Sequence, residues 1–119
     1  MRIEKIVNAG KNVAYIETDE IIMTDVQSAL DLLVTVSFEY ECEAIIINKS
    51  SITEEFFDLS TRLAGEIVQK YVNYGMRLAI IGDFSNYKSK ALHDFIYECN
   101  HGRNLYFVKD ENEALLKLS

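Results

Sequence analysis

The run Ala44-Ile45-Ile46-Ile47-Asn48 (AIIIN) decides the fold class of this 119-residue chain. A short, continuous β-branched run is typical of a strand that is buried on both faces of a sheet. Two similar apolar runs follow at residues 78–81 (LAII) and 105–108 (LYFV). Segments with helical spacing lie between them, and strands that alternate with helices predict an α/β fold with a mostly parallel sheet.

Four segments with helical spacing of apolar residues are expected to form helices. Asp25 or the threonine before it can cap the first helix. The face of this helix that is expected to pack into the core carries Val26, Ala29, Leu30, Leu33 and Val34. The second helix is expected to begin near Asp58 and to end at Gly75. Its core-facing side carries Leu59, Leu63, Ile67, Val68 and Tyr71. Ser89 can cap the third, and Asp110 opens the fourth with a glutamate three residues later, as in a capping box.

An antiparallel hairpin is expected at the start of the chain. Residues 2–8 and 13–18 have strand character, and Asn8-Ala9-Gly10-Lys11 is a turn signal between them. The expected order is therefore β-β-α-β-α-β-α-β-α, in one α/β domain over 1–119 with right-handed crossovers. The hairpin leaves a sheet edge, so pairing of two copies as a homodimer is one possibility, although Lys5 and Lys11 can guard that edge.

Composition and charge exclude several classes of protein. The chain has no proline, where roughly six would be usual, and only five glycines, so long flexible linkers are not expected. Gly65 is the one glycine inside a predicted helix. The formal net charge is −7, and residues 1–58 carry twelve acidic but only four basic side chains. Nucleic acid is therefore not an expected partner, because such binding depends on basic contacts to phosphate.

No signal for export, membrane insertion or metal binding is found. The start of the chain has no apolar segment of the signal-peptide kind, and no apolar run approaches the ~18 residues of a membrane span. Cys42 and Cys99 lack metal-ligand spacing and are too few for a disulfide framework. We therefore expect a cytoplasmic protein with no membrane partner, no metal and no cofactor.

Three stretches resemble a bacterial family known as domain of unknown function 4180. They are IMTDVQSALDL at 22–32, FFDLST at 56–61 with LAGE at 63–66, and GDFS at 82–85 with FIYE at 95–98. The resemblance runs almost from end to end of the chain. It implies membership of the family, but it implies no activity, because the family has none assigned.

The expected order of elements also resembles the STAS domains, the sulfate-transporter and anti-sigma-factor-antagonist fold. In antagonists of that type, a partner kinase phosphorylates a serine in an Asp-Ser-Ser-Gly motif at the start of the helix after the third strand. This chain has Asp58-Leu59-Ser60-Thr61 at the corresponding place, with Leu59 instead of the first serine and no glycine directly after. Residues 49–57 resemble an insertion before that helix. The resemblance implies the fold more strongly than the phosphorylation switch.

Polar side chains gather in two loops that follow predicted strands. The carboxyl ends of parallel strands meet at one edge of a sheet, where ligands and partners often bind. The candidate binding residues in these loops and in the helix after the first are Asp58, Ser60, Thr61, Arg62, Glu66, Gly82, Asp83, Ser85, Lys88 and Ser89. Aspartate and serine are also the usual helix caps, so capping is the alternative for Asp58, Ser60, Ser85 and Ser89, and for any single one of them it is the commoner role.

The sequence favours a binding module over an enzyme. It contains no phosphate-loop motif, no serine or cysteine in a recognisable catalytic motif, and no second carboxylate near Asp83 at metal-ligand spacing. The leading hypothesis is a non-enzymatic regulatory domain of STAS-like type that contacts an unknown protein partner, with Ser60 or Thr61 as possible phosphorylation positions. The alternative is a small-molecule-binding or enzymatic domain that uses a cleft between the loops around Asp58 and Asp83.

Overall fold

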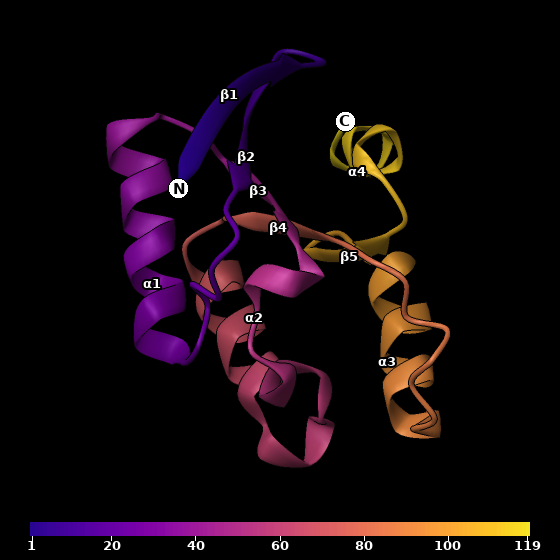
Figure 1. Cartoon of the computed structure of the whole chain (residues 1–119). Coiled ribbons are helices and arrows are strands. Elements are labelled where there is room, and N and C mark those ends of the chain that lie inside the picture. Colours follow the sequence, from indigo (N-terminus) through magenta and orange to yellow (C-terminus); the bar gives the residue numbers. More distant parts are fainter.

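Five strands and four α-helices follow one another in the predicted order in the computed structural model, which describes residues 1–119 (Figure 1). The strands are β1 (Arg2–Asn8), β2 (Lys11–Glu17), β3 (Ala44–Asn48), β4 (Arg77–Ile81) and β5 (Leu105–Val108). The helices are α1 (Val26–Val34), α2 (Leu63–Asn73), α3 (Lys90–Asn100) and α4 (Glu111–Leu118). None of them has the length and apolarity that crossing a membrane requires.

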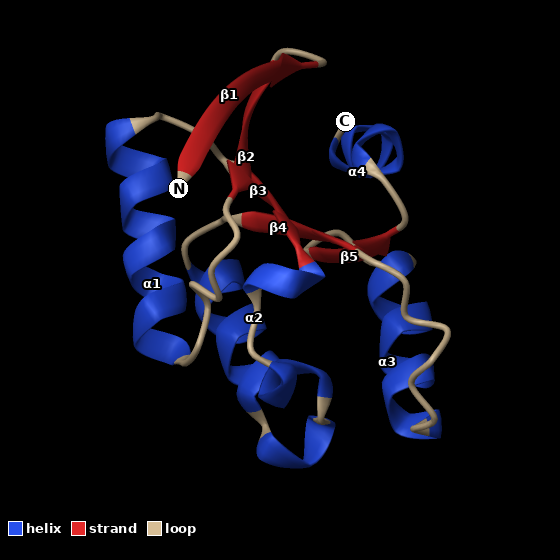
Figure 2. Cartoon of the chain, in the orientation of Figure 1, coloured by secondary structure: helices blue, strands red, loops and turns tan.

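The strands lie in the sheet in their sequence order, β1-β2-β3-β4-β5. β1 and β2 are antiparallel, and the other three neighbouring pairs are parallel. Each crossover therefore steps to the next strand in the same direction, and crossovers of one hand place α1, α2 and α3 on the same face. Only α4, which leads to no further strand, lies on the other face (Figures 1 and 2). The predicted α/β fold with its opening hairpin is confirmed.

The central strands are buried on both faces, as the AIIIN run predicts. Ile45 and Ile47 point into the larger core under α1, α2 and α3, whereas Ile46 points to the smaller core under α4. All three isoleucine side chains have no solvent exposure. Complete burial of such a side chain contributes roughly 1.5–3 kcal/mol, so the layers on both sides are needed to stabilise this strand.

The helix caps predicted at Asp25, Ser89 and Asp110 are confirmed. The carboxylates of Asp25 and Asp110 accept from backbone N–H groups three residues later, and the Ser89 hydroxyl does the same for Leu92. Gly75 follows α2 with a φ of +69°, a left-handed backbone that favours glycine after a helix. These features are local, which explains why the sequence alone predicts them.

Two helices differ in detail from the prediction. In α1, Leu32 is buried and Val34 is 49 % exposed, and the chain continues into a π-helical turn at Thr35–Glu39. The second helix begins at Leu63 instead of near Asp58, because the preceding Arg62 has a left-handed backbone with a φ of 67°. Residues Leu59–Thr61 form a separate 3-10 turn.

Candidate functional site

The two polar loops lie side by side at one edge of the sheet. Asn48 at the end of β3 pairs with Ile81 at the end of β4, so the segments that follow both strands leave the sheet next to each other. All but one of the candidate binding residues belong to these segments, 49–62 and 82–89, and Glu66 lies further on, in the first turn of α2. The expectation that the loops meet is therefore correct in its topology.

Asp58 and Asp83 form the same local turn, one in each loop. The Asp58 carboxylate accepts from the Ser60 N–H at 3.1 Å and from the Ser60 hydroxyl at 2.7 Å. The Asp83 carboxylate accepts in the same way from Ser85, at 2.9 Å and 2.6 Å. These hydrogen bonds to the serine hydroxyl and N–H hold the pKa of each carboxyl below its usual range. Both carboxylates thus stabilise their own loops.

Three further candidates have contrasting surroundings. The Thr61 hydroxyl lies 2.7 Å from the Glu55 carbonyl and 2.8 Å from that of Asp58, and it accepts from the Leu63 N–H at 3.2 Å. This hydroxyl therefore connects the backbone at Glu55 and Asp58, before the helix, to the start of α2. Ser89 caps α3. Lys88 is exposed and takes part in no ion pair.

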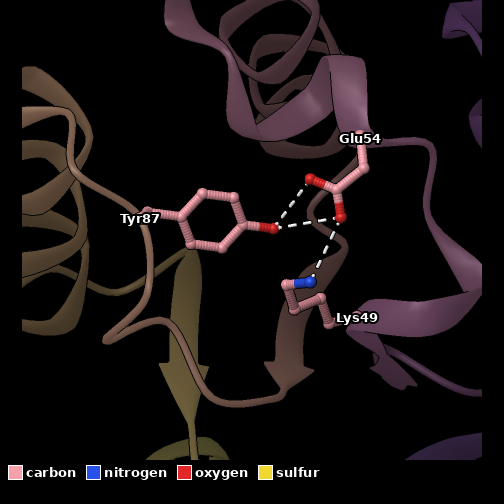
Figure 3. A network of polar contacts seen from close by, with 3 residues as sticks. All are labelled: Lys49, Glu54 and Tyr87. Carbon is pink, nitrogen blue, oxygen red and sulfur yellow. Dashed lines mark hydrogen bonds and ion pairs between the residues drawn. The ribbon is translucent and has the colours of Figure 1, made fainter.

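A polar bridge between the two loops is the feature that sequence reasoning missed (Figure 3). The Lys49 ammonium lies 3.1 Å from Glu54 Oε1. The Tyr87 hydroxyl of the other loop lies 3.1 Å from Glu54 Oε1 and 2.9 Å from Oε2. Figure 3 shows the three side chains pointing toward one another, so this Lys49–Glu54–Tyr87 bridge fastens the segment after β3 to the segment after β4.

Aromatic rings and a glycine complete the surroundings of Lys49. Its ammonium lies 5.0 Å from the ring centroid of Tyr87 and 5.6 Å from that of Phe57, within the range of cation–π attraction. Its stem runs over Gly82, where an added Cβ would lie 2.8 Å from Lys49 Cβ. Gly82 is therefore a packing requirement of the bridge, since any larger residue would push the lysine away.

The pKa shifts of the bridge residues and of the two cysteines do not favour a lysine or cysteine nucleophile. The Tyr87 side chain, and after it the Glu54 carboxylate, hold the pKa of Lys49 above its ordinary value. Burial raises the pKa of Tyr87. Burial also raises the pKa of both thiols, Cys42 and Cys99, to about 11 for the latter. A nucleophilic lysine or cysteine needs a shift in the opposite direction.

The bridge lies between Asp58 and Asp83, the two carboxylates that were expected to share one cleft. A hollow of about 490 Å³ on one side is lined by Asp58, Lys88 and Ser89, and one of about 250 Å³ is lined by Asp83. Glu54 and Tyr87 form a wall of both. No hydrogen bond joins the two turns, and no three His, Cys, Asp or Glu side chains are grouped to hold a metal ion.

A larger groove crosses α2, and two of the candidate residues line it. This α2 groove has a volume of about 670 Å³ and lies over Gly65, with Val26 of α1 and Phe95 of α3 among its walls. The remaining lining residues are Leu59, Arg62, Glu66, Gln69 and Lys70. The sequence signals that point here are the glycine inside a predicted helix and the two candidate residues Arg62 and Glu66.

Comparison with known proteins identifies one family. The family described as Domain of unknown function (DUF4180) matches residues 8–118, which include both polar loops and the α2 groove. No curated protein and no solved structure matches the chain. Because the match covers nearly the whole chain, this protein belongs to the DUF4180 family.

Proposed function

We propose that this chain is a non-enzymatic protein-binding module and that its α2 groove receives an amphipathic helix of a partner protein. The observation that carries the proposal is Gly65, an exposed glycine in the first turn of α2. A glycine inside a helix costs about 0.5–1 kcal/mol relative to alanine. Nothing in the chain requires that cost: an added Cβ would have no neighbour within 4 Å, and the backbone is not left-handed.

The missing side chain at Gly65 leaves the α2 backbone accessible within the groove. Figure 1 shows α2 between α1 and α3, so a helix lying across α2 would reach both neighbours. At Gly65 it could approach the α2 backbone directly, as glycine permits at close contacts. Val26 and Phe95 offer apolar surface on either side. An amphipathic helix that lays its apolar face into a groove is a common mode of peptide recognition.

Charged side chains supply the rim of the groove. Arg62, Glu66 and Lys70 follow one another at intervals of four residues along α2, so charges of alternating sign border the apolar walls. None of the three forms an ion pair within the chain. An apolar centre with a polar rim is the usual anatomy of a protein interface, and the free charges would select and orient the partner helix.

The resemblance to STAS domains supports a regulatory role of this kind. We keep Ser60 as the proposed phosphorylation position, because it is exposed and lies just before the groove-lining Arg62. Thr61 is less suited, since its hydroxyl joins the turns to α2. A phosphate on Ser60 would remove the hydrogen that its hydroxyl donates to Asp58 and would repel that carboxylate. Intact-mass analysis of the protein from its own cell tests this: unmodified protein under every growth condition contradicts it.

The alternative function is small-molecule binding in the hollows beside the bridge. Its supporting observation is that Asp58 and Asp83, in the segments that follow β3 and β4, each line a hollow. We rank it second because both carboxylates are already hydrogen-bonded in their own turns.

Affinity capture with matched variants distinguishes the two functions. Gly65→Gln fills the groove with a helix-compatible side chain, whereas Ala91→Gln adds similar bulk at an exposed position in α3 outside the groove. We expect a protein captured by the wild-type chain and by Ala91→Gln to be lost with Gly65→Gln. Circular dichroism must show that both variants are folded.

Two results would contradict the proposal. One is capture of the same proteins by Gly65→Gln and by the wild-type chain. The other is a metabolite that co-purifies with the wild-type chain and is lost on Asp83→Asn, with no protein dependent on Gly65. That second result would favour the small-molecule alternative.

A further inference from the structure

A basic hollow lies at the amino ends of the strands, away from both polar loops. It has a volume of about 470 Å³ and contains no apolar and no acidic residue. Its lining consists of Lys11, Gly75, Arg77, Arg103, Asn104 and Ser119. Lys11 is the first residue of β2, Arg77 is the first of β4 and Arg103 lies in the turn before β5, so three separate parts of the chain bring cations together.

The Arg77 guanidinium is held in a fixed position in this hollow. Its Nε donates to the Arg103 carbonyl at 2.8 Å and its Nη1 to the Leu118 carbonyl at 2.9 Å. Its Nη2 donates to the Tyr106 hydroxyl at 2.8 Å and to the Lys117 carbonyl at 3.2 Å. A guanidinium has five N–H donors, so one hydrogen on Nη1 remains for a ligand. All four partners are neutral oxygens, so none of these hydrogen bonds neutralises the positive charge of the guanidinium.

The other cations of the hollow are also unpaired. The ion pairs of the chain involve Arg2, Lys49 and Lys90, and none involves Lys11 or Arg103. This is notable in a chain with a net charge of −7, which has acidic side chains in excess. Clustered like charges repel one another, so the arrangement is unfavourable until an anion neutralises it.

We propose that this basic hollow binds a phosphate group. Phosphate carries a charge of about −1.5 to −2 at neutral pH and offers oxygens on several sides. It can therefore contact cations that come from three separate parts of the chain. The absence of any apolar lining indicates that the recognised group is polar throughout. The phosphate can belong to a small molecule or to a phosphorylated side chain. The site is independent of the α2 groove, because the two share no residue.

A titration with inorganic phosphate tests the proposal directly. Two-dimensional amide NMR spectra at low salt should show saturable shifts at Lys11, Gly75 and Asn104. The double variant Lys11→Gln/Arg103→Gln should weaken binding at least about tenfold. Lys109→Gln removes an exposed, unpaired cation directly after β5, outside the hollow, and should leave the affinity unchanged. Arg77 is left intact because it ties α4 to the sheet.

The outcomes are separable from those of the groove experiment. Equal binding by the double variant and the wild-type chain would overturn the proposal, as would equal shifts with chloride at matched ionic strength. Titrations with O-phosphoserine and with a phosphoserine peptide distinguish the sources of the phosphate. Tighter binding of the peptide than of phosphate assigns the site to a phosphorylated chain, and equal binding assigns it to small anions.

Discussion

Gly82 and Gly65 lie in two regions that use glycine for opposite reasons. At Gly82 an added Cβ would meet Lys49 at 2.8 Å and 3.0 Å and Phe84 at 3.2 Å, whereas at Gly65 it would meet nothing within 4 Å. In the loops around the bridge, the carboxylates of Asp58 and Asp83 and the three bridge side chains are bonded within the loops, while the α2 groove leaves free space and free charges. Polar residues at strand ends can therefore be fully occupied in holding loops, and unoccupied surface is the better guide to binding.

The largest expected effect is that of Gly82→Ala. The new methyl group must displace the Lys49 stem close to its backbone, and overpacking of this kind typically costs roughly 1–3 kcal/mol. The free energy of unfolding measured in urea should fall by that amount. Gly82→Ala in a Lys49→Gly background is the control, because without the lysine side chain the same substitution should cost much less than it does in the wild-type chain. If the stability of the single variant is unchanged, Gly82 is not required for the packing of Lys49.

Tyr87→Phe should have the next largest effect. It deletes the hydroxyl that contacts Glu54 from the other loop, and loss of such a hydrogen bond costs about 0.5–1.5 kcal/mol. Tyr97→Phe is the matched control, since this side chain is 67 % exposed on α3. In a double-mutant cycle with Glu54→Gln, the two losses should be less than additive. Full additivity would mean that the two loops are not coupled through this contact.

Gly65→Ala should act in the opposite direction and stabilise the isolated chain. Alanine lowers the entropy of the unfolded chain and meets no clash here, so we expect a gain of about 0.5–1 kcal/mol in urea unfolding. The gain should come with weaker binding of a helical partner. A loss of stability would show that the chain itself needs this glycine, and the main support for the α2 groove would disappear.

The smallest effect should be the dependence of the Asp83 turn on pH. The pKa of Asp83 is lowered in the folded chain by its hydrogen bonds to Ser85, so its stabilising contribution is present above the ordinary carboxyl pKa near ~3.9. The contribution is lost as the pH falls through the lower, folded value. Asp83→Asn should therefore lower the midpoint of thermal unfolding slightly at pH 7, and the difference should shrink at pH 3. A constant difference would contradict the pKa shift.

Features that depend on neighbouring residues were predictable from the sequence. Ser89 and Asp110 cap helices because the N–H groups they accept from lie only three residues away. The buried AIIIN strand follows from β-branched side chains that need cover on both faces. The predicted start of α2 was wrong, because the left-handed backbone of Arg62 depends on how the preceding turns pack.

The sequence by itself thus determined the order of the elements, the class of the sheet and most of the helix ends, since these depend on short-range spacing and burial. Only the tertiary structure decided which polar side chains are occupied and which are free. Glu54 and Tyr87 are 33 residues apart, and Lys11, Arg77 and Arg103 come from three distant parts of the chain. Such contacts depend on how strands and crossovers are placed in space, and no local pattern in the chain encodes them.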